Sequence, residues 1–348
     1  CGFNGSIINP IITHSTKNGN IRKVKNDKID SKGIAKLGLS KDIPVSQFPA
    51  KLVLELRSLT RKYYDLTDER SAHINKLKGD LHTVFPQYLD VFCDVTGKTS
   101  TMILRQYGTP DKILRGHKKT MIEKISKASR KGLAKASERY EKLCAAANAA
   151  KTFGCQIDSI YFNIFLTLDL VEKLDSALDS ILNRIRQLIT FNKNEKFIQQ
   201  IKLLNTIPGV GFLTAVTIMC EIGDFSAFRN PKQLFAYFGL DPEVNESGKF
   251  VGTQLHMSKR GSRIARRAIF AVALASIRTK RNGEGINPYL RKYYELKSGQ
   301  KPKMVAIGAV MHKVCNIVFA VLRDEKAFEL RSPEEHCKQY QRPALAAA

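Results

Sequence analysis

Apolar residues recur at steps of three and four along most of the chain, and this spacing places them on one face of an α-helix. Residues 48–92 follow it as far as Phe85-Pro86, which predicts one long amphipathic helix with a basic outer face. Residues 165–188 follow it as a coiled-coil seam does, over about three heptads. A coiled coil between subunits and a helical hairpin within one chain both fit this second pattern.

Residues 111–142 carry a thin apolar stripe, and 11 of them are Lys or Arg against 4 Asp or Glu. A solvated helix and a helix that faces nucleic acid fit this charge about equally. Two more helices are predicted near the end of the chain. One follows Ser262 and is crowded with small residues, and a last apolar helix runs from Lys303 through Leu322.

The end of a β-strand is predicted at the start of the chain. Ser6-Ile7-Ile8 stops at Asn9-Pro10, as a buried strand does where it ends. The chain opens with Cys1 rather than Met, inside this predicted strand, so we expect a natural N-terminus to be missing.

The composition limits the classes of function. The 348 residues suffice for two or three domains, and 57 Lys and Arg against 32 acidic residues give a net charge of +25. A chain this basic is expected to bind nucleic acid, although a ribosome-associated protein would fit as well. The seven cysteines form no Cys-x-x-Cys pair, which argues against a zinc ribbon and suits reduced thiols in the cytoplasm. The sequence contains no run of about 18 apolar residues and no signal peptide, so no membrane partner is expected.

Asp27 and Asp30 are the first candidate site residues. They stand three residues apart, so a helix places both carboxylates on one face, and oxygen ligands of this kind suit Mg²⁺. Asp27 is also placed to cap the helix by accepting its first free N–H groups. Spacing alone favours the cap.

A glycine turn at residues 207–211, Ile-Pro-Gly-Val-Gly, separates two segments of helical spacing. Gly209 and Gly211 let backbone N–H groups face outward where the second helix starts, and the positive end of a helix suits a phosphate. An isolated turn of this kind is more often only a connection between helices. Downstream come a Glu-Ser-Gly loop and a basic run that includes Lys259, Arg260, Arg263, Arg266 and Arg267.

The order of these pieces resembles the C-terminal domain of the DEDD transposases, the insertion-sequence family numbered 110 (with 116 and 902), which also contains the Piv-type invertases. The pieces that carry the resemblance are residues 207–211, 228–242, 246–248, 258–261 and 266–268. Upstream, Asp27 and Asp30 fall on the two acids of the family's Lys-Thr-Asp-x-x-Asp-Ala segment, with Asn26 and Ser31 as departures. The resemblance therefore favours a metal site over a helix cap for this pair.

The resemblance implies an α/β plus α fold. A partial RuvC-like domain of the ribonuclease-H type would occupy residues 1–95, and a basic helical and coiled-coil connector residues 96–196. A mostly α-helical C-terminal transposase domain with a helix-hairpin-helix-like turn would occupy residues 197–330, followed by a tail at 331–348. The family's other two carboxylates lie on strands that precede Ser6, so they are expected to be missing here.

The resemblance also implies the chemistry. In this family an acidic cluster binds Mg²⁺, and the serine of the Glu-Ser-Gly loop, here Ser247, is the nucleophile that cuts and rejoins DNA. A bridging RNA encoded by the element guides the choice of sequence, and we expect a homo-oligomer (dimer or tetramer) associated with the bacterial nucleoid. Asp27 and Asp30 would bind the metal, and DNA would be bound by Gly209, Gly211, Lys259, Arg260, Arg263, Arg266 and Arg267.

Other readings of the residues stay open. Ser258 and Ser262 are rival nucleophiles, although their cationic surroundings favour phosphate contact. A DNA-binding or repair protein built on the glycine turn, without strand-transfer chemistry, is one alternative function, and an RNA-binding scaffold is another. With two of the family's four carboxylates, the chain as it stands is expected to bind nucleic acid without cutting it.

Overall fold

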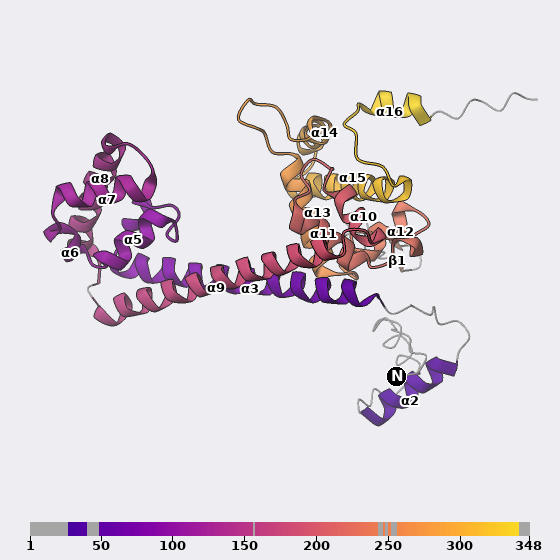
Figure 1. Ribbon diagram of the computed structural model, residues 1–348, viewed down its shortest axis with the longest axis horizontal. Helices are drawn as coiled ribbons and strands as arrows, with labels where there is room; N and C mark the ends of the chain where they lie inside the picture. The colour runs from indigo at the N-terminus through magenta and orange to yellow at the C-terminus, as the bar shows by residue number, and fades with distance from the viewer. Residues whose placement is uncertain are drawn as a thin grey trace, which may run out of the picture.

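The computed structural model describes residues 27–39, 49–155, 157–242, 246–247, 250–251 and 256–340. These residues are mostly α-helical, and the long helices expected from the apolar spacing are present (Figure 1). After α2 (Asp27–Leu39), the helices form three groups. Two long helices make an arm, a small cluster that we call the head lies at one end of it, and a larger cluster that we call the body lies at the other.

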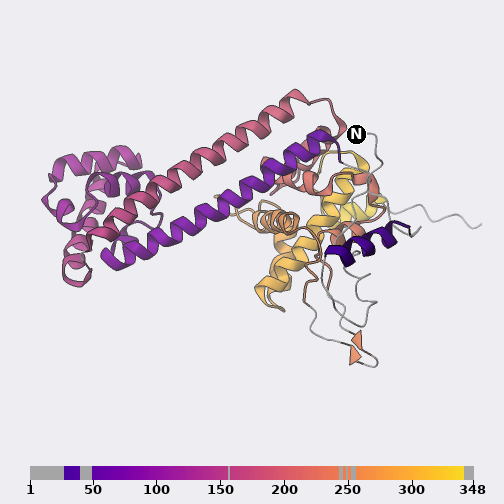
Figure 2. The same ribbon diagram turned by 90° about the horizontal axis from the view of Figure 1, so that it is seen from below.

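The arm consists of α3 (Lys51–Val84) and α9 (Asp158–Phe191), each 34 residues and therefore roughly 50 Å long. The two helices run antiparallel and side by side in both views (Figures 1 and 2). Their apolar faces enter both cores, with Leu56 and Ile185 in the body and Leu77 and Ile164 in the head. Within the predicted seam at 165–188, Leu178, Ile185 and Leu188 are therefore buried within one chain, as in a helical hairpin, whereas Leu166 and Leu170 are exposed.

The head is built on an aromatic cluster where α3 ends. Phe85, Tyr88 and Phe92 pack ring against ring, with centroids 5.1 and 4.9 Å apart, and the Tyr88 hydroxyl donates to the Ser100 carbonyl at 3.0 Å. The predicted basic segment at 111–142 lies within the head. The head helices are α4 (Tyr88–Val91), α5 (Lys98–Gln106), α6 (Pro110–Arg115), α7 (Lys118–Ser129) and α8 (Leu133–Phe153).

The body is centred on α15 (Lys303–Asp324), the predicted last apolar helix. By length and composition α15 could cross a membrane, but 56% of its most apolar window is buried among its neighbours, as in the core helix of a globular domain. Around it lie α10 (Lys196–Leu204), α11 (Phe212–Ile222), the 3₁₀ turn η2 (Phe225–Ala227), α12 (Pro231–Tyr237), α13 (Arg263–Ser276), α14 (Pro288–Ser298) and α16 (Pro333–Tyr340).

Strand pairing in the described part of the chain is short. β1 (Glu246–Ser247) pairs antiparallel with β2 (Phe250–Val251), and Ser247 lies opposite Phe250. The predicted strand end at Ser6 to Pro10 lies outside the described residues. The partial RuvC-like domain at 1–95 therefore stays a prediction, because the described residues of this range form the helices α2, α3 and α4.

Candidate nucleic-acid interface

The glycine turn at 207–211 has the predicted helix, turn, helix shape, since it connects α10 to α11. Gly209 has a φ of +97°, which favours glycine, and a Cβ added to it would lie 2.5 Å from the Ser276 hydroxyl. That hydroxyl donates to the Pro208 carbonyl at 3.0 Å. Gly209 therefore packs the turn against the end of α13, which is a structural role.

Gly211 differs from Gly209 in its backbone conformation and in the space around its Cα. Its φ of −83° is open to any residue, and a Cβ on it would meet nothing within 4 Å. It is exposed at the N-cap of α11, and no side chain caps this helix end. The positive end of α11 is therefore accessible to an anion at Gly211.

The basic run predicted to bind DNA begins in a turn that is hydrogen-bonded to the residues just after α12. The Ser258 N–H donates to the Asp241 carbonyl at 2.8 Å, and the Lys259 N–H donates to the Gly239 carbonyl at 3.0 Å. The backbones approach so closely that a Cβ on Gly261 would lie 2.0 Å from the Tyr237 carbonyl oxygen. This turn is therefore rigidly placed on the body.

The five predicted DNA-binding cations divide into two kinds. Lys259, Arg260 and Arg263 are exposed, and within the described residues no hydrogen bond or ion pair engages their side chains. Arg266 is half-buried, and its Nη1 donates to three carbonyl oxygens at 2.8 to 3.2 Å. Arg267 pairs with Asp68 of α3 at 2.7 Å. The structure thus commits two of the cations to the protein itself and leaves three facing solvent.

The rival nucleophiles are also engaged. The Ser258 hydroxyl donates to the Asp241 carboxylate at 2.6 Å. The Ser262 hydroxyl caps α13 by accepting from the Ala265 N–H at 3.1 Å, and it donates to a Glu221 carboxylate oxygen at 2.7 Å. Ser247 lies in β1, but its side chain is outside the described part of the structure.

Glu221 is a site residue that the sequence reasoning missed. Its side chain is 2% exposed, and its carboxylate accepts two hydrogen bonds from Arg61 of α3, at 2.8 and 2.9 Å. The Tyr237 hydroxyl donates to the Glu221 carbonyl at 3.0 Å, and Arg57 donates to the neighbouring Cys220 carbonyl at 2.7 Å. Glu221 therefore joins the arm to α11, α12 and the N-terminus of α13.

Two features of the sequence pointed to this network. Glu221 is the single charged residue of the otherwise apolar helix α11, and Arg57 and Arg61 stand four residues apart on α3. Burial alone would raise the pKa of Glu221, but the hydrogen bonds from Arg61 and Ser262 outweigh it and hold that pKa below its usual value. The carboxylate is therefore charged in the folded protein at neutral pH.

The predicted metal ligands Asp27 and Asp30 belong to α2, and their side chains lie outside the described part of the structure. As a donor set, two carboxylates suit Mg²⁺, which takes one or two acids and completes its octahedron with water or phosphate oxygens. Among the described residues, no group of three or more His, Cys, Asp or Glu side chains is placed to hold a metal ion.

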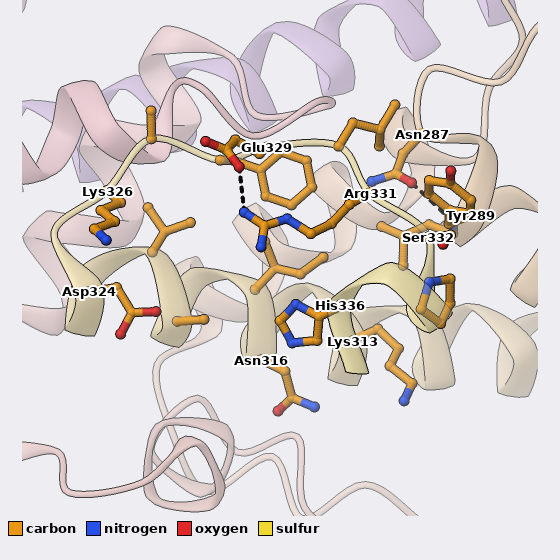
Figure 3. A pocket seen from close by; sticks show the side chains of 18 residues that line it. Asn287, Tyr289, Lys313, Asn316, Asp324, Lys326, Glu329, Arg331, Ser332 and His336 are labelled. Atoms are coloured by element: carbon orange, nitrogen blue, oxygen red, sulfur yellow. Dashed lines mark hydrogen bonds and ion pairs between the residues drawn. The ribbon is translucent and has the colours of Figure 1, made fainter. Parts of the chain in front are cut away.

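A cavity of about 410 Å³ lies between α14, α15 and the segment that leads into α16 (Figure 3). Its lining is mostly apolar. Two of its polar groups already have partners, because Asn287 caps α14 through the Leu290 N–H and Arg331 pairs with Glu329. None of the residues that line it belongs to the basic turn.

Two segments of the chain match models of known transposase families. Residues 201–295 match the family described as Transposase IS116/IS110/IS902 family, and residues 1–86 match a DEDD transposase family of the IS110 type. The chain belongs to the IS116/IS110/IS902 transposase family. The second match covers Asp27 and Asp30, and a DEDD transposase family implies, in general, dependence on a divalent metal ion.

Several known proteins are similar in sequence to the chain. An uncharacterised 43.6 kDa protein of insertion element IS110 from Streptomyces coelicolor is 23% identical over 81% of this chain and 66% of its own length. The pilin gene-inverting protein of Moraxella bovis is 30% identical over 51% of this chain and 52% of its own length. The transposase for insertion sequence element IS1111A of Coxiella burnetii is 26% identical over 52% of this chain and 50% of its own length. The chain thus spans half to two thirds of these relatives.

The Glu221 network gives a prediction on stability. Glu221→Gln keeps the size of the side chain and removes its charge, so we expect it to lower the free energy of unfolding at pH 7 by about 1–2 kcal/mol. Because the folded pKa lies below the unfolded value, the advantage of the wild type is complete above about pH 4.3 and is lost as pH falls through the folded pKa. Urea unfolding of both proteins along a pH series measures this difference. A gap that stays constant down to pH 2 contradicts the assignment.

The two glycines of the turn are expected to respond differently. Gly209→Ala forces a side chain into a positive φ and against Ser276, so we expect a loss of about 1–3 kcal/mol in stability. Gly211→Asp supplies a favoured helix cap, so stability should hold or rise, but its carboxylate repels a phosphate. DNA affinity should fall for Gly211→Asp and not for its neutral match Gly211→Asn. Equal DNA affinities of the Asp and Asn variants would show that no phosphate approaches this helix end.

Proposed function

We infer that the chain is the DNA-handling part of a recombinase that cuts and rejoins DNA at the ends of an insertion element. Membership in the transposase family supports this inference, as do the names of its relatives, which include a transposase and a gene-inverting protein. The net charge of +25 suits a nucleic-acid partner. The observation that carries the proposal is the rigid basic turn from which the hairpin with Ser247 extends.

That turn forms the base of the Ser247 hairpin. An isolated bridge pairs Pro242 with Met257, and the Ser258 and Lys259 N–H groups donate to carbonyls of residues 241 and 239. Beyond this base, β1 and β2 pair with Ser247 opposite Phe250. We propose that Ser247 of this hairpin and the three exposed cations at its base engage one DNA backbone.

In the proposed reaction, the Ser247 hydroxyl oxygen attacks the phosphorus of one phosphodiester. A new bond forms between the serine oxygen and phosphorus, the bond to one deoxyribose oxygen breaks, and the serine proton is transferred through a base to that leaving oxygen. Rejoining is the reverse step with a different deoxyribose hydroxyl. Lys259, Arg260 and Arg263 would hold flanking phosphates through charge-assisted hydrogen bonds. Ser258 and Ser262 are weaker candidates because both hydroxyls already donate to carboxylates.

Mg²⁺ is the metal that we propose, held by Asp27 and Asp30 with further oxygen ligands. When bound, it would supply Lewis-acid stabilisation of the charge that develops on the phosphate. Guidance by a bridging RNA is likewise proposed, on the family resemblance alone.

A homo-oligomer is proposed from a row of exposed apolar side chains on the arm. Phe162, Leu166 and Leu170 stand four residues apart on α9 and are 62, 46 and 44% exposed. A second copy of the chain could cover this row, since its α9 carries the same one. Light scattering in solution tests the proposal, and a monomeric mass at high concentration contradicts it.

The alternative is a helix-hairpin-helix DNA-binding or repair protein without strand-transfer chemistry. The accessible N-terminus of α11 at Gly211 favours it, because such an end can bind a backbone phosphate without a nucleophile. DNA binding without cleavage by the full-length protein, at any magnesium concentration, would support this alternative.

The basic turn gives the first prediction on function. Replacing Lys259, Arg260 and Arg263 together by Gln should weaken binding to duplex DNA by at least about tenfold at 50 mM salt. The slope of log affinity against log salt should fall by up to about 2.7, since each phosphate contact contributes about 0.9. Stability should change little. In contrast, Arg266→Gln should first destabilise the fold, because three carbonyl oxygens lose their donor.

Ser247 gives the second prediction. In the full-length protein, Ser247→Ala should abolish cleavage of a labelled DNA substrate, while affinity for that DNA stays within about twofold. Ser258→Ala and Ser262→Ala serve as controls that should still cut, with reduced stability. Cleavage that survives Ser247→Ala and disappears in either control assigns the nucleophile to the basic turn instead.

A further inference from the structure

The turn between α7 and α8 in the head is a second concentration of unpaired positive charge. Residues 124–135 contain five cations and no acidic residue. All five cations are exposed, and none of their side chains forms an ion pair within the described part of the chain; they are Lys124, Lys127, Arg130, Lys131 and Lys135. Nearby lysines do have acidic partners, because Lys118 pairs with Glu141 and Lys142 with Glu138. Within the described residues, five cations that form no ion pair are therefore gathered at this turn.

This turn repeats the construction of the basic turn in the body. Ser129-Arg130-Lys131-Gly132 precedes α8, and Ser258-Lys259-Arg260-Gly261 precedes α13. In both, the residue after the serine has a left-handed backbone, with a φ of 53° at Arg130 and 54° at Lys259. These are two of the three non-glycine residues with positive φ in the described chain. The same four-residue pattern thus presents two cations before a helix N-terminus at opposite ends of the arm.

The turn in the head is open to approach by a large partner. A Cβ on Gly132 would meet nothing within 4 Å, and α8 begins there without a side-chain cap or an acidic residue in its first turn. The positive end of a 21-residue helix therefore adds to the five cations. Ser126 stabilises the turn by donating to the Lys131 carbonyl at 2.8 Å.

The surroundings of the turn favour a double helix over a single strand. Single strands are bound by stacking their bases on exposed aromatic rings. Near the turn, Tyr140 is buried and Tyr107 lies under Lys124, whose Nζ is 5.6 Å from the ring centroid. The exposed Phe153 lies at the far end of α8, roughly 30 Å along the helix. What remains at the turn are point charges, which contact phosphates without reading bases.

We propose that the α7–α8 turn is a second binding surface for duplex DNA, formed by Lys124, Lys127, Arg130, Lys131 and Lys135. The proposal rests on the proposed function in one respect, namely that DNA is the nucleic acid the protein handles. The surface contacts backbone phosphates and carries no sequence preference of its own. Because the arm helices are roughly 50 Å long, it binds DNA well away from the basic turn of the body.

The test compares variants of the whole chain that remove the same charge from different places. In the head variant Lys127, Arg130 and Lys131 become Gln, and in the arm control Lys62, Lys76 and Lys78 of α3, which are also exposed, become Gln. Affinity for a 30-base-pair DNA duplex is measured by fluorescence anisotropy between 50 and 200 mM salt. We expect the head variant to bind at least about tenfold more weakly at 50 mM salt and the arm control within about twofold.

A second head variant guards against misfolding at the turn. It replaces Lys124, Lys127 and Lys135 by Gln and leaves Arg130 and Gly132 unchanged, and the same loss of affinity is expected. Circular dichroism and urea unfolding check that each variant is folded. Equal affinities of the folded head variants and the arm control overturn the proposal, because net charge alone would then explain binding.

Two further probes separate this proposal from the proposed function. If the triple variant of Lys259, Arg260 and Arg263 loses DNA affinity and the head variants do not, the head surface is refuted while the proposed function stands. If the head variants lose affinity and that triple variant does not, the head surface stands and the interface on the body fails. A loss confined to an RNA duplex, with DNA binding intact, also overturns the proposal.

Discussion

A buried carboxylate holds the arm, the body and the basic turn in one arrangement. Removing the Glu221 carboxylate from water is costly, and the cost is offset because Arg61 and Ser262 donate hydrogen bonds to it. Arg61 belongs to α3 and Ser262 caps α13, so one charged group fixes the angle of the arm and the start of the helix that carries the basic turn. Arg61 is 52% exposed, so solvent screens part of its attraction to the carboxylate. The several hydrogen bonds to Glu221 therefore matter more than its charge pair alone.

The arm fixes the position of the head relative to the body. A single helix, α3, contributes Leu56 to the body core and Leu77 to the head core. It cannot bend sharply between them without losing hydrogen bonds within the helix, and Arg70 of α3 also pairs with Asp175 of α9 midway. The head is therefore held at a set distance from the body, although its core shares no residue with the core of the body.

The local sequence pattern predicted the helices and the glycine turn of this fold. Contacts between residues far apart in the sequence decide which of the charged side chains are engaged. The long helix ending at Phe85-Pro86 and the glycine turn follow from apolar spacing and from glycine chemistry, which act over a few residues. The predicted basic outer face of α3 was partly wrong, because Arg57, Arg61 and Arg70 donate to groups of α11 and α9. These partners are more than 100 residues away in sequence, so no local pattern identifies them. For the same reason the sequence could not divide the five cations at 259–267 into exposed and engaged ones.

The backbone of the two basic turns bears on what their cations do. A left-handed conformation costs a non-glycine residue about 1–2 kcal/mol, so stability alone would favour glycine at Arg130 and at Lys259. Charge makes each position less favourable still, because both cations stand among others of the same sign with no acidic partner in the described chain. Both side chains are exposed, so side-chain packing does not offset these costs, although hydrogen bonds to neighbouring residues hold each turn. A polyanion bound at each turn would offset the repulsion between the cations. The proposed binding of phosphates at each turn would account for the strain and the charge together.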